Sequence, residues 1–562
     1  MSAQRMSNAD AAWLHMDRPT NLMVVNALLW FEDPVDVGRV REVLRSRLVE
    51  PFPRFRQLVA EPRLGIGVPS WEDDPNFDLD LHVHHLALPA PGDKQALEEL
   101  VGDLISRPLD RRKALWDWYL VDGFGAGMAM IVRIHHCIAD GIALSRVLLS
   151  LTDTHADAGI APPRARSGRG RLGSVAAPVK AGARVAQAGV HEGIEILTHP
   201  TAELPALASR GSADAATLAK LLLTGSDAKT VLSAKPGVAR RVTWSERIPL
   251  DDLKAIGHAT GTTVNDVLTA AMTGALRRYL LGRDSLVDEI RTTVPYNLRP
   301  LDEPLPRELG NRFGLVYLTL PVGIADPADR LAEVHRRMDA IKHSPEGGLS
   351  YAILEAVGRT PHQIEQSLLD VFTQKTSAVL SNTPGPREPV YFAGSKIAGV
   401  VPWVPAAGTI GMGIDMMSYN GGVTVSLQVD AGLIPDPDTI IADYQREVET
   451  LRQLKPAKPA AREKRATAAA PAKPSKPATR EKRATAAKPP KPATREKRAT
   501  TATAVAPAKR AARPASPSAP RTNRRSPSYD KISERAYFIS LDEGGGDEVA
   551  NWLRAERELA TA

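Results

Sequence analysis

Cysteine is nearly absent from this sequence. Cys137 is the single cysteine among 562 residues, which excludes an internal disulfide framework. Long apolar runs are missing too: no uninterrupted stretch of about 20 apolar residues occurs, so a membrane-spanning helix is not expected. The opening residues contain no basic region followed by an apolar one, so no secretory signal is expected either. These absences together predict a cytoplasmic protein.

Acidic residues are scarce in one part of the chain, residues 455–528. This segment holds 10 Lys and 11 Arg against 3 Glu and no Asp, a net charge of +18. The whole chain carries +7, so the other residues carry −11. The segment contains three near-copies of one unit, AREKRATAA, TREKRATAA and TREKRATTA, which begin at Ala461, Thr479 and Thr494. Such a composition cannot bury enough apolar surface to fold, so we expect a disordered basic tail.

Three interpretations of this basic tail remain open. It could make peripheral contact with an anionic membrane or a lipid droplet, at about 1 kcal/mol for each basic residue near the surface. It could be a spacer to the last segment, or it could bind nucleic acid without sequence preference. No aromatic residues interleave with the basic ones, so base stacking is not supported and nucleic acid is the weakest of the three. Contact at the inner membrane or at lipid inclusions is the location that the first interpretation implies.

The remaining chain alternates strand-like and helix-like segments, which is typical of layered α/β domains. Apolar runs predict strands at Leu22–Trp30, Leu115–Val121, Met128–Ile134, Gly314–Val322 and Gly422–Val429. Helical spacing predicts helices at Val37–Val49 after an Asp36 N-cap, Leu97–Ile105, Gly141–Leu151 and Thr262–Leu281. We divide the chain into domains 1–160 and 239–454, a crossover or linker 161–238, the basic tail 455–528 and a two-helix module 529–562.

The segment His135-His136-Cys137-Ile138-Ala139-Asp140-Gly141 carries the strongest chemical signal. It follows a predicted buried strand, in which neighbouring side chains point to opposite faces. One histidine can therefore face a cavity while the other packs. Asp140 can brace the turn, and Gly141 permits the backbone geometry that begins the next helix. A histidine at a rigid strand end suits a general base, because its unperturbed pKa is about 6.5.

Two alternatives to catalysis exist for these histidines. An isolated histidine beside a strand is most often an ordinary packed polar residue. A metal site would need more ligands than two neighbours on one strand supply, and the sequence has no H-E-x-x-H motif or cysteine cluster. We therefore expect no metal.

Six segments besides the histidine segment give the chain a family resemblance. They are SNADAAWL near the N-terminus, LDRRKALWDW with Ala114 in place of the usual proline, TVNDVLTAA, VPYNLRP with Tyr296 in place of valine, LGNRFG and SNTPGP. Over roughly residues 5–454 the chain resembles the bacterial wax ester synthase/acyl-CoA:diacylglycerol acyltransferase family. That family belongs to the chloramphenicol acetyltransferase-like superfamily. The resemblance implies two layered α/β domains with the active site and a tunnel at their interface.

The resemblance also implies acyl transfer from a long-chain acyl-CoA to the hydroxyl of diacylglycerol or a long-chain alcohol. Acyl-CoA is then a substrate, and no cofactor is expected. An alcohol is about as weak an acid as water, so it attacks a thioester poorly unless a base removes its proton. Our catalytic candidates are His136 as the base, His135 as its support, and Asp140, for which a clamping pair with Arg299 is the hypothesis.

The oxyanion of the intermediate needs hydrogen-bond donors. Asn265 and Asn382 are the candidates, although an Asn before a helix is commonly an N-cap and an Asn before Thr-Pro-Gly is commonly in a turn. Ser381 lacks a G-x-S-x-G context, so a covalent serine mechanism is not expected. The CoA-binding residues are not identifiable, and the basic segment RARSGRGR is only a weak candidate for the phosphates.

Two other functions compete with lipid ester synthesis. One is an acyltransferase with a different acceptor, as in condensation-like enzymes, although no carrier domain adjoins. The other is a lipid- or nucleic-acid-associated protein with an inactive site, which the intact H-H-x-x-x-D-G argues against. An acyl-CoA assay with diacylglycerol and alcohols in parallel separates these functions.

Overall fold

The computed structural model describes residues 3–62, 67–160, 217, 220–221, 223–300, 303–342, 344–358 and 369–454. Most of the predicted linker 161–238 lies outside the described residues, and so do the RARSGRGR segment, the basic tail and the two-helix module. The domain limits at those places therefore stay predictions.

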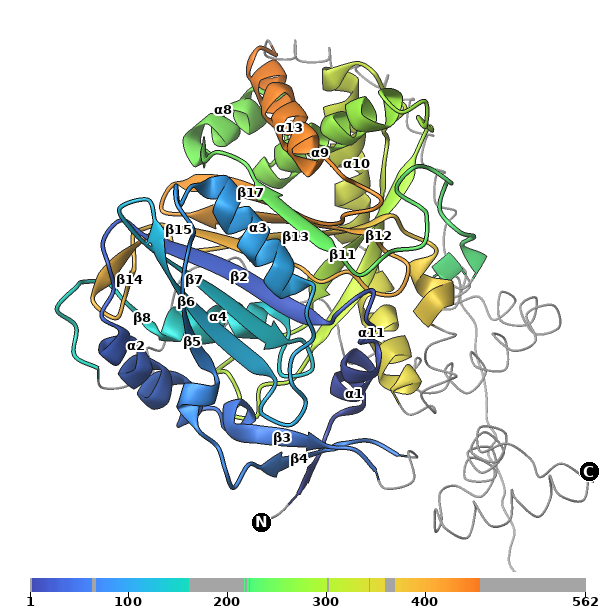
Figure 1. The fold of residues 1–562 in the computed structure, drawn as a ribbon. Coiled ribbons are helices and arrows are strands. Elements are labelled where there is room, and N and C mark those ends of the chain that lie inside the picture. Colours follow the sequence, from blue (N-terminus) through green and yellow to red (C-terminus); the bar gives the residue numbers. More distant parts are fainter. Residues whose placement is uncertain are drawn as a thin grey trace, which may run out of the picture. The chain divides into compact units, whose positions relative to one another are not determined.

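Two seven-stranded sheets form the frame of the described part (Figure 1). The first sheet has the order β5-β6-β7-β2-β15-β14-β8, with strands Val83–Ala87, Trp116–Phe124, Gly127–His135, Val24–Phe31, Ser395–Trp403, Tyr391–Phe392 and Thr152–Asp153. The second sheet has the order β10-β17-β16-β13-β11-β12, and β9 (Arg240–Trp244) also pairs with β17. In that order, its first six strands are Ile248–Pro249, Gly422–Asp430, Met412–Tyr419, Ala378–Pro384, Ile290–Asn297 and Phe313–Leu320. A small third sheet orders β1-β4-β3, at Gln4–Arg5, Ser70–Asp73 and Gln57–Ala60.

The helices cover faces of these sheets. Around the first sheet lie α1 (Asn8–His15), α2 (Val37–Leu44), α3 (Lys94–Ile105) and α4 (Gly141–Ser150), with short turns at Arg45–Val49, Pro53–Arg56 and Leu79–Leu81. The second group is α8 (Leu250–Thr260), α9 (Val264–Leu281), α10 (Pro327–Lys342), α11 (Glu346–Val357) and α13 (Pro437–Arg452). Figure 1 shows α8, α9, α10 and α13 gathered beside the second sheet. Their apolar faces and one face of that sheet form a continuous hydrophobic core.

The predicted α/β class is confirmed, and so are the main predicted elements. The helix at Val37 begins after Asp36, whose carboxylate accepts a hydrogen bond from the Arg39 N–H at 3.0 Å. The strand before the histidines is buried along its whole length, because β2 and β6 flank it and both faces are covered. The predicted helix at Thr262–Leu281 is α9, with Thr263 as its N-cap.

One pairing crosses the halves of the chain. β15 comes from the second half of the sequence, yet it pairs antiparallel with β2 in the first sheet, with Val401 opposite Leu28. β14 continues this edge and pairs with β8. The first sheet is therefore completed by residues from the second half.

Among the described residues, no helix is both long enough and apolar enough to cross a membrane.

Candidate active site

The histidine segment is held where β7 ends and α4 begins. The backbone N–H of His135 donates to Leu115 O at 2.9 Å, and that of His136 donates to Met23 O at 2.7 Å. Asp140 then caps α4, because its Oδ1 accepts from the N–H of Ala143 at 2.7 Å. Both ends of the segment are thus fixed by hydrogen bonds, and the two histidine rings sit on a rigid support.

His136 contacts the LGNRFG segment through Asn311. The Nδ1 atom of His136 lies 2.9 Å from Asn311 Oδ1, and both side chains are buried. The Nδ2 atom of Asn311 donates at 2.8 Å to the main-chain oxygen of His136 and at 2.8 Å to Asp10 Oδ1. Asp10 also accepts from the Asn311 N–H at 2.8 Å. Asn311 therefore lies between α1 and the histidine.

This network determines the tautomer of His136. A main-chain carbonyl can only accept, so Nδ2 of Asn311 must be the group beside it and Oδ1 must face the imidazole. Oδ1 can only accept, so the proton of the neutral ring is on Nδ1. The lone pair is then on Nε2, which is the nitrogen a general base needs.

The aromatic surroundings keep His136 neutral. Trp13 stacks on the imidazole with ring centroids 4.4 Å apart, and Phe313 lies at 5.3 Å. Burial lowers the pKa of His136 to about 4, although the Asp140 carboxylate opposes this shift. The ring is consequently an unprotonated base at neutral pH.

His135 points away from this site. Its Nδ1 accepts from the N–H of Cys137 at 3.2 Å, and its Nε2 lies 3.7 Å from Asp17 Oδ2. The ring is buried and lines neither of the cavities described below. The two histidines thus face opposite sides, as the alternation of a strand requires.

Asp140 lies among donors from the second half of the chain. Its Oδ2 accepts from the N–H of Arg312 at 3.0 Å, and Arg299 Nη2 lies 3.5 Å from the same oxygen. Arg299 Nη2 also donates to Gly310 O at 3.1 Å. Asp140 therefore ties the start of α4 to the segments around Arg299 and Arg312.

Gly141 needs a different explanation from the one the sequence supplied. It is the first residue of α4 and its backbone is not in the left-handed region, so conformation alone does not require glycine. A Cβ at this position would meet no heavy atom within 4 Å, and Gly141 lines a cavity. The missing side chain leaves this part of the cavity open.

Asn265 and Asn382 are brought together. The Asn382 amide donates to Asn265 Oδ1 at 2.6 Å. Asn265 is not an N-cap, because Thr263 caps α9. Asn382 is not in a turn, because it lies within β13. Asn382 lines the same cavity as His136, whereas Asn265 is not among its lining residues.

His136 lines two cavities. The larger, about 290 Å³, lies between α4 and strands β13, β15 and β16, and we name it the α4 cavity. The smaller, about 130 Å³, is lined by α11, β12 and Trp13, and we name it the α11 cavity. Pro295, Phe313, Val404 and Pro405 also line both. The candidate base is therefore placed where two substrates could approach each other.

No group of three His, Cys, Asp or Glu side chains within the described ranges is arranged to hold a metal ion.

Three polar residues of this region were not identified as site residues from the sequence. Asn311 and Asp10 belong to segments that supported the family resemblance, so those segments were the available signal. Asp415 lines the α4 cavity and is buried, but nothing around it in the sequence marks it. Its environment arises only when β16 pairs with β13.

The fold and the histidine site define an acyltransferase of the wax ester synthase/diacylglycerol acyltransferase type. Residues 6–268 match the model of the wax ester synthase/diacylglycerol acyltransferase catalytic domain, and residues 309–452 match that of the WS/DGAT C-terminal domain. The chain belongs to this family.

Known relatives agree with this assignment. The chain is 29% identical to a probable diacylglycerol O-acyltransferase, tgs1, of Mycobacterium tuberculosis, over 79% of this chain and 95% of the relative. It is also 29% identical to the probable diacylglycerol O-acyltransferase tgs2 of the same organism, over 79% and 98%. The solved wax ester synthase/diacylglycerol acyltransferase from Marinobacter aquaeolei VT8 has the same fold, with a TM-score of 0.57 and 23% identity over 80% of this chain and 98% of that one.

Proposed function

We propose that this protein transfers a long-chain acyl group from acyl-CoA to the hydroxyl of diacylglycerol or of a long-chain alcohol. The observation that carries the proposal is the neutral His136, oriented by Asn311 at the junction of two cavities. The family membership and the relatives' names support the choice of substrates.

His136 is the general base in this proposal. Its Nε2 takes the proton of the acceptor hydroxyl as the oxygen attacks the thioester carbonyl carbon. The C–S bond of the tetrahedral intermediate then breaks, and the proton returns to the CoA sulfur. The products are the new ester and free CoA. Because the thiolate leaves readily, a weak base suffices.

The other candidate residues act around this step. His135 and Asp140 hold the segment, with Arg299 bound to Asp140 and Gly141 leaving space for substrate. Asn382 is the better placed of the two candidate oxyanion donors because it lines the α4 cavity, and Asn265 orients its amide. We assign the acyl chain to the α11 cavity, whose lining is mostly apolar, and the acceptor to the α4 cavity.

The test is an acyl-CoA assay of the full chain with diacylglycerol and a long-chain alcohol in parallel. His136→Ala should lower the rate with both acceptors by about 10²–10⁴-fold, the usual contribution of a general base. His258→Ala, an exposed histidine of α8, is the matched control and should retain activity. Near-normal transfer by His136→Ala would falsify the assignment of the base.

Contact with lipid is a separate part of the proposal, supported by the charge of +18 on residues 455–528. We propose that this tail attaches a cytoplasmic enzyme peripherally to anionic membrane or lipid inclusions. Co-sedimentation of the full chain with anionic vesicles should be strong at low salt and lost at high salt. A variant with the basic residues of the three repeats changed to Gln is the control. Salt-insensitive retention, or none at all, would reject the electrostatic attachment.

A further inference from the structure

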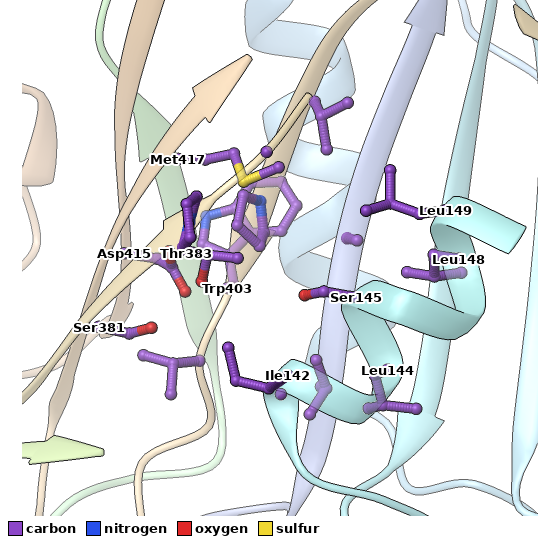
Figure 2. A pocket seen from close by; sticks show the side chains of 18 of the residues that line it. Ile142, Leu144, Ser145, Leu148, Leu149, Ser381, Thr383, Trp403, Asp415 and Met417 are labelled. Atoms are coloured by element: carbon purple, nitrogen blue, oxygen red, sulfur yellow. The ribbon is translucent and has the colours of Figure 1, made fainter. Parts of the chain in front are cut away.

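The α4 cavity has one polar wall, which two neighbouring strands supply. β13 and β16 run parallel, with Ser381 opposite Asp415 and Thr383 opposite Met417. Residues opposite each other in a ladder point to the same face, and all four side chains line the cavity. Figure 2 shows Ser381, Thr383 and Asp415 grouped on this wall, opposite α4.

The side chains of β16 alternate between two environments. Met412, Ile414 and Met416 alternate with the cavity residues and pack into the hydrophobic core of the second sheet. Asp415 lies between two of these core residues, yet it points to the other face. It is therefore the one carboxylate that β16 presents to the cavity.

Asp415 is buried, and no cation among the described residues pairs with it. The residue is only 5% exposed. Within the described residues, its Oδ1 atom has no hydrogen-bond partner. Burial raises the pKa of Asp415 to about 7, against opposing interactions with Ser381, the N–H of Met416 and Thr383. An unpartnered buried carboxyl oxygen is costly, so a bound ligand that pairs with it would be favoured.

Most of the remaining cavity wall is apolar, although His136, Asp140, Ser145, Thr152, Asn297 and Asn382 also line it. Trp403 and Met417 lie beside the polar group, and α4 contributes aliphatic side chains across the cavity (Figure 2). A ligand that fits this arrangement has long apolar chains and hydrogen-bonding oxygens close to its reacting hydroxyl. Diacylglycerol has two ester groups on the same three-carbon backbone as its hydroxyl, whereas a long-chain alcohol has no oxygen besides the hydroxyl that reacts.

We propose that Ser381, Thr383 and Asp415 form a polar subsite that binds an ester group of a diacylglycerol acceptor and so favours diacylglycerol over long-chain alcohols. The two hydroxyls and the protonated carboxyl donate to the ester oxygens. This inference rests on the proposed function, because it concerns the acceptor of the same reaction.

The experiment compares kcat/KM of the full chain for a 1,2-diacylglycerol and for hexadecanol with the same acyl-CoA. Ser381→Ala and Thr383→Val should each lower the value for diacylglycerol by about three- to tenfold, as expected for one lost hydrogen bond. The value for hexadecanol should change by less than about twofold in the same variants. Asp415→Asn should retain the preference because its amide still donates, whereas Asp415→Leu should lose it.

The alcohol reaction of each variant shows that the variant is folded. Met417→Leu, on the same wall but without a polar atom, is the matched control and should leave the acceptor ratio unchanged. Equal losses with both acceptors, no loss with diacylglycerol, or a wild type that esterifies only the alcohol would each overturn the subsite. A wild type that esterifies neither acceptor would overturn the proposed function itself.

Discussion

Asn311 holds His136 in one tautomer: its Oδ1 accepts the Nδ1 proton at 2.9 Å while its Nδ2 donates to the main-chain oxygen of the same histidine. The residue that orients the proposed base is thus 175 positions away in the sequence. Because the amide group contacts both the ring and the backbone of His136, it fixes the direction of Nε2 as well as its protonation.

Removal of the Asn311 amide should therefore impair the chemical step more than substrate binding. We expect Asn311→Ala to lower kcat by roughly 10- to 100-fold, comparable to the loss of other groups that position a catalytic residue, with a smaller change in KM. Asn76→Ala, an exposed asparagine, is the control. An effect confined to KM would contradict a positioning role.

The pKa of His136, lowered to about 4, predicts an unusual pH profile. The base loses its proton above about pH 4, so kcat/KM with a long-chain alcohol should stay level down to about pH 5 instead of falling below about 6.5. The same shift gives a contribution to folding stability that is present above about pH 6.5 and is lost as the pH falls toward 4. An acid limb near 6.5 would show that the histidine is not desolvated as described.

The pair Asp140–Arg299 should be energetically coupled. Asn is also a good N-cap, so Asp140→Asn keeps the cap of α4 but removes both the charge that faces Arg299 and the acceptor of the Arg312 N–H. In urea unfolding, a cycle of Asp140→Asn and Arg299→Ala should show a coupling energy of about 1 kcal/mol. A cycle of Asp140→Asn with the distant Arg446→Ala should be additive. Additivity in both cycles would exclude the pairing.

A larger side chain at Gly141 would test whether the open space of the α4 cavity is needed for activity, without a change of charge. Gly141→Val should fold normally, because a Cβ meets nothing there, but its side chain should enter the α4 cavity. We expect kcat/KM to fall by about tenfold or more, since small displacements of a substrate are costly. Gly348→Val is a matched control: Gly348 lies in α11, its Cβ would also be uncrowded, and it lines neither cavity. Equal activity losses in both variants would contradict this explanation.

Asp415 should destabilise the protein increasingly as the pH rises. Its pKa is 3.8 as an unperturbed group and about 7 when folded, so the unfolded chain releases its proton first. The stability penalty is absent below about pH 4, grows between 4 and 7, and reaches at most roughly 4 kcal/mol at about 1.36 kcal/mol for each pKa unit. Asp415→Asn should therefore raise Tm at pH about 8 and not at about 4. A Tm difference that is independent of pH would contradict the raised pKa.

Local patterns in the sequence predicted much of this fold. The Asp36 cap, the buried strand before His135 and the long helix α9 each follow from residues within one element. The opposite orientation of the two histidines also follows from strand periodicity. What local patterns could not supply are relationships between distant segments: Asn311 beside His136, Asp415 beside Ser381, and β15 beside β2. The sequence predicted a backbone role for Gly141, and this was wrong for the same reason. The space beside its Cα is part of the α4 cavity, which other elements help to build.

The pairing of β15 with β2 has a consequence for synthesis of the protein. The first sheet cannot be completed until the ribosome has released residues as far as Trp403, because β15 occupies the position between β2 and β14. Until then one edge of β2 is unpaired, although β7 and the histidine segment next to it have already been made. The nascent chain therefore exposes an apolar strand edge for most of its translation, and this period is when we expect aggregation and the need for chaperones to be greatest.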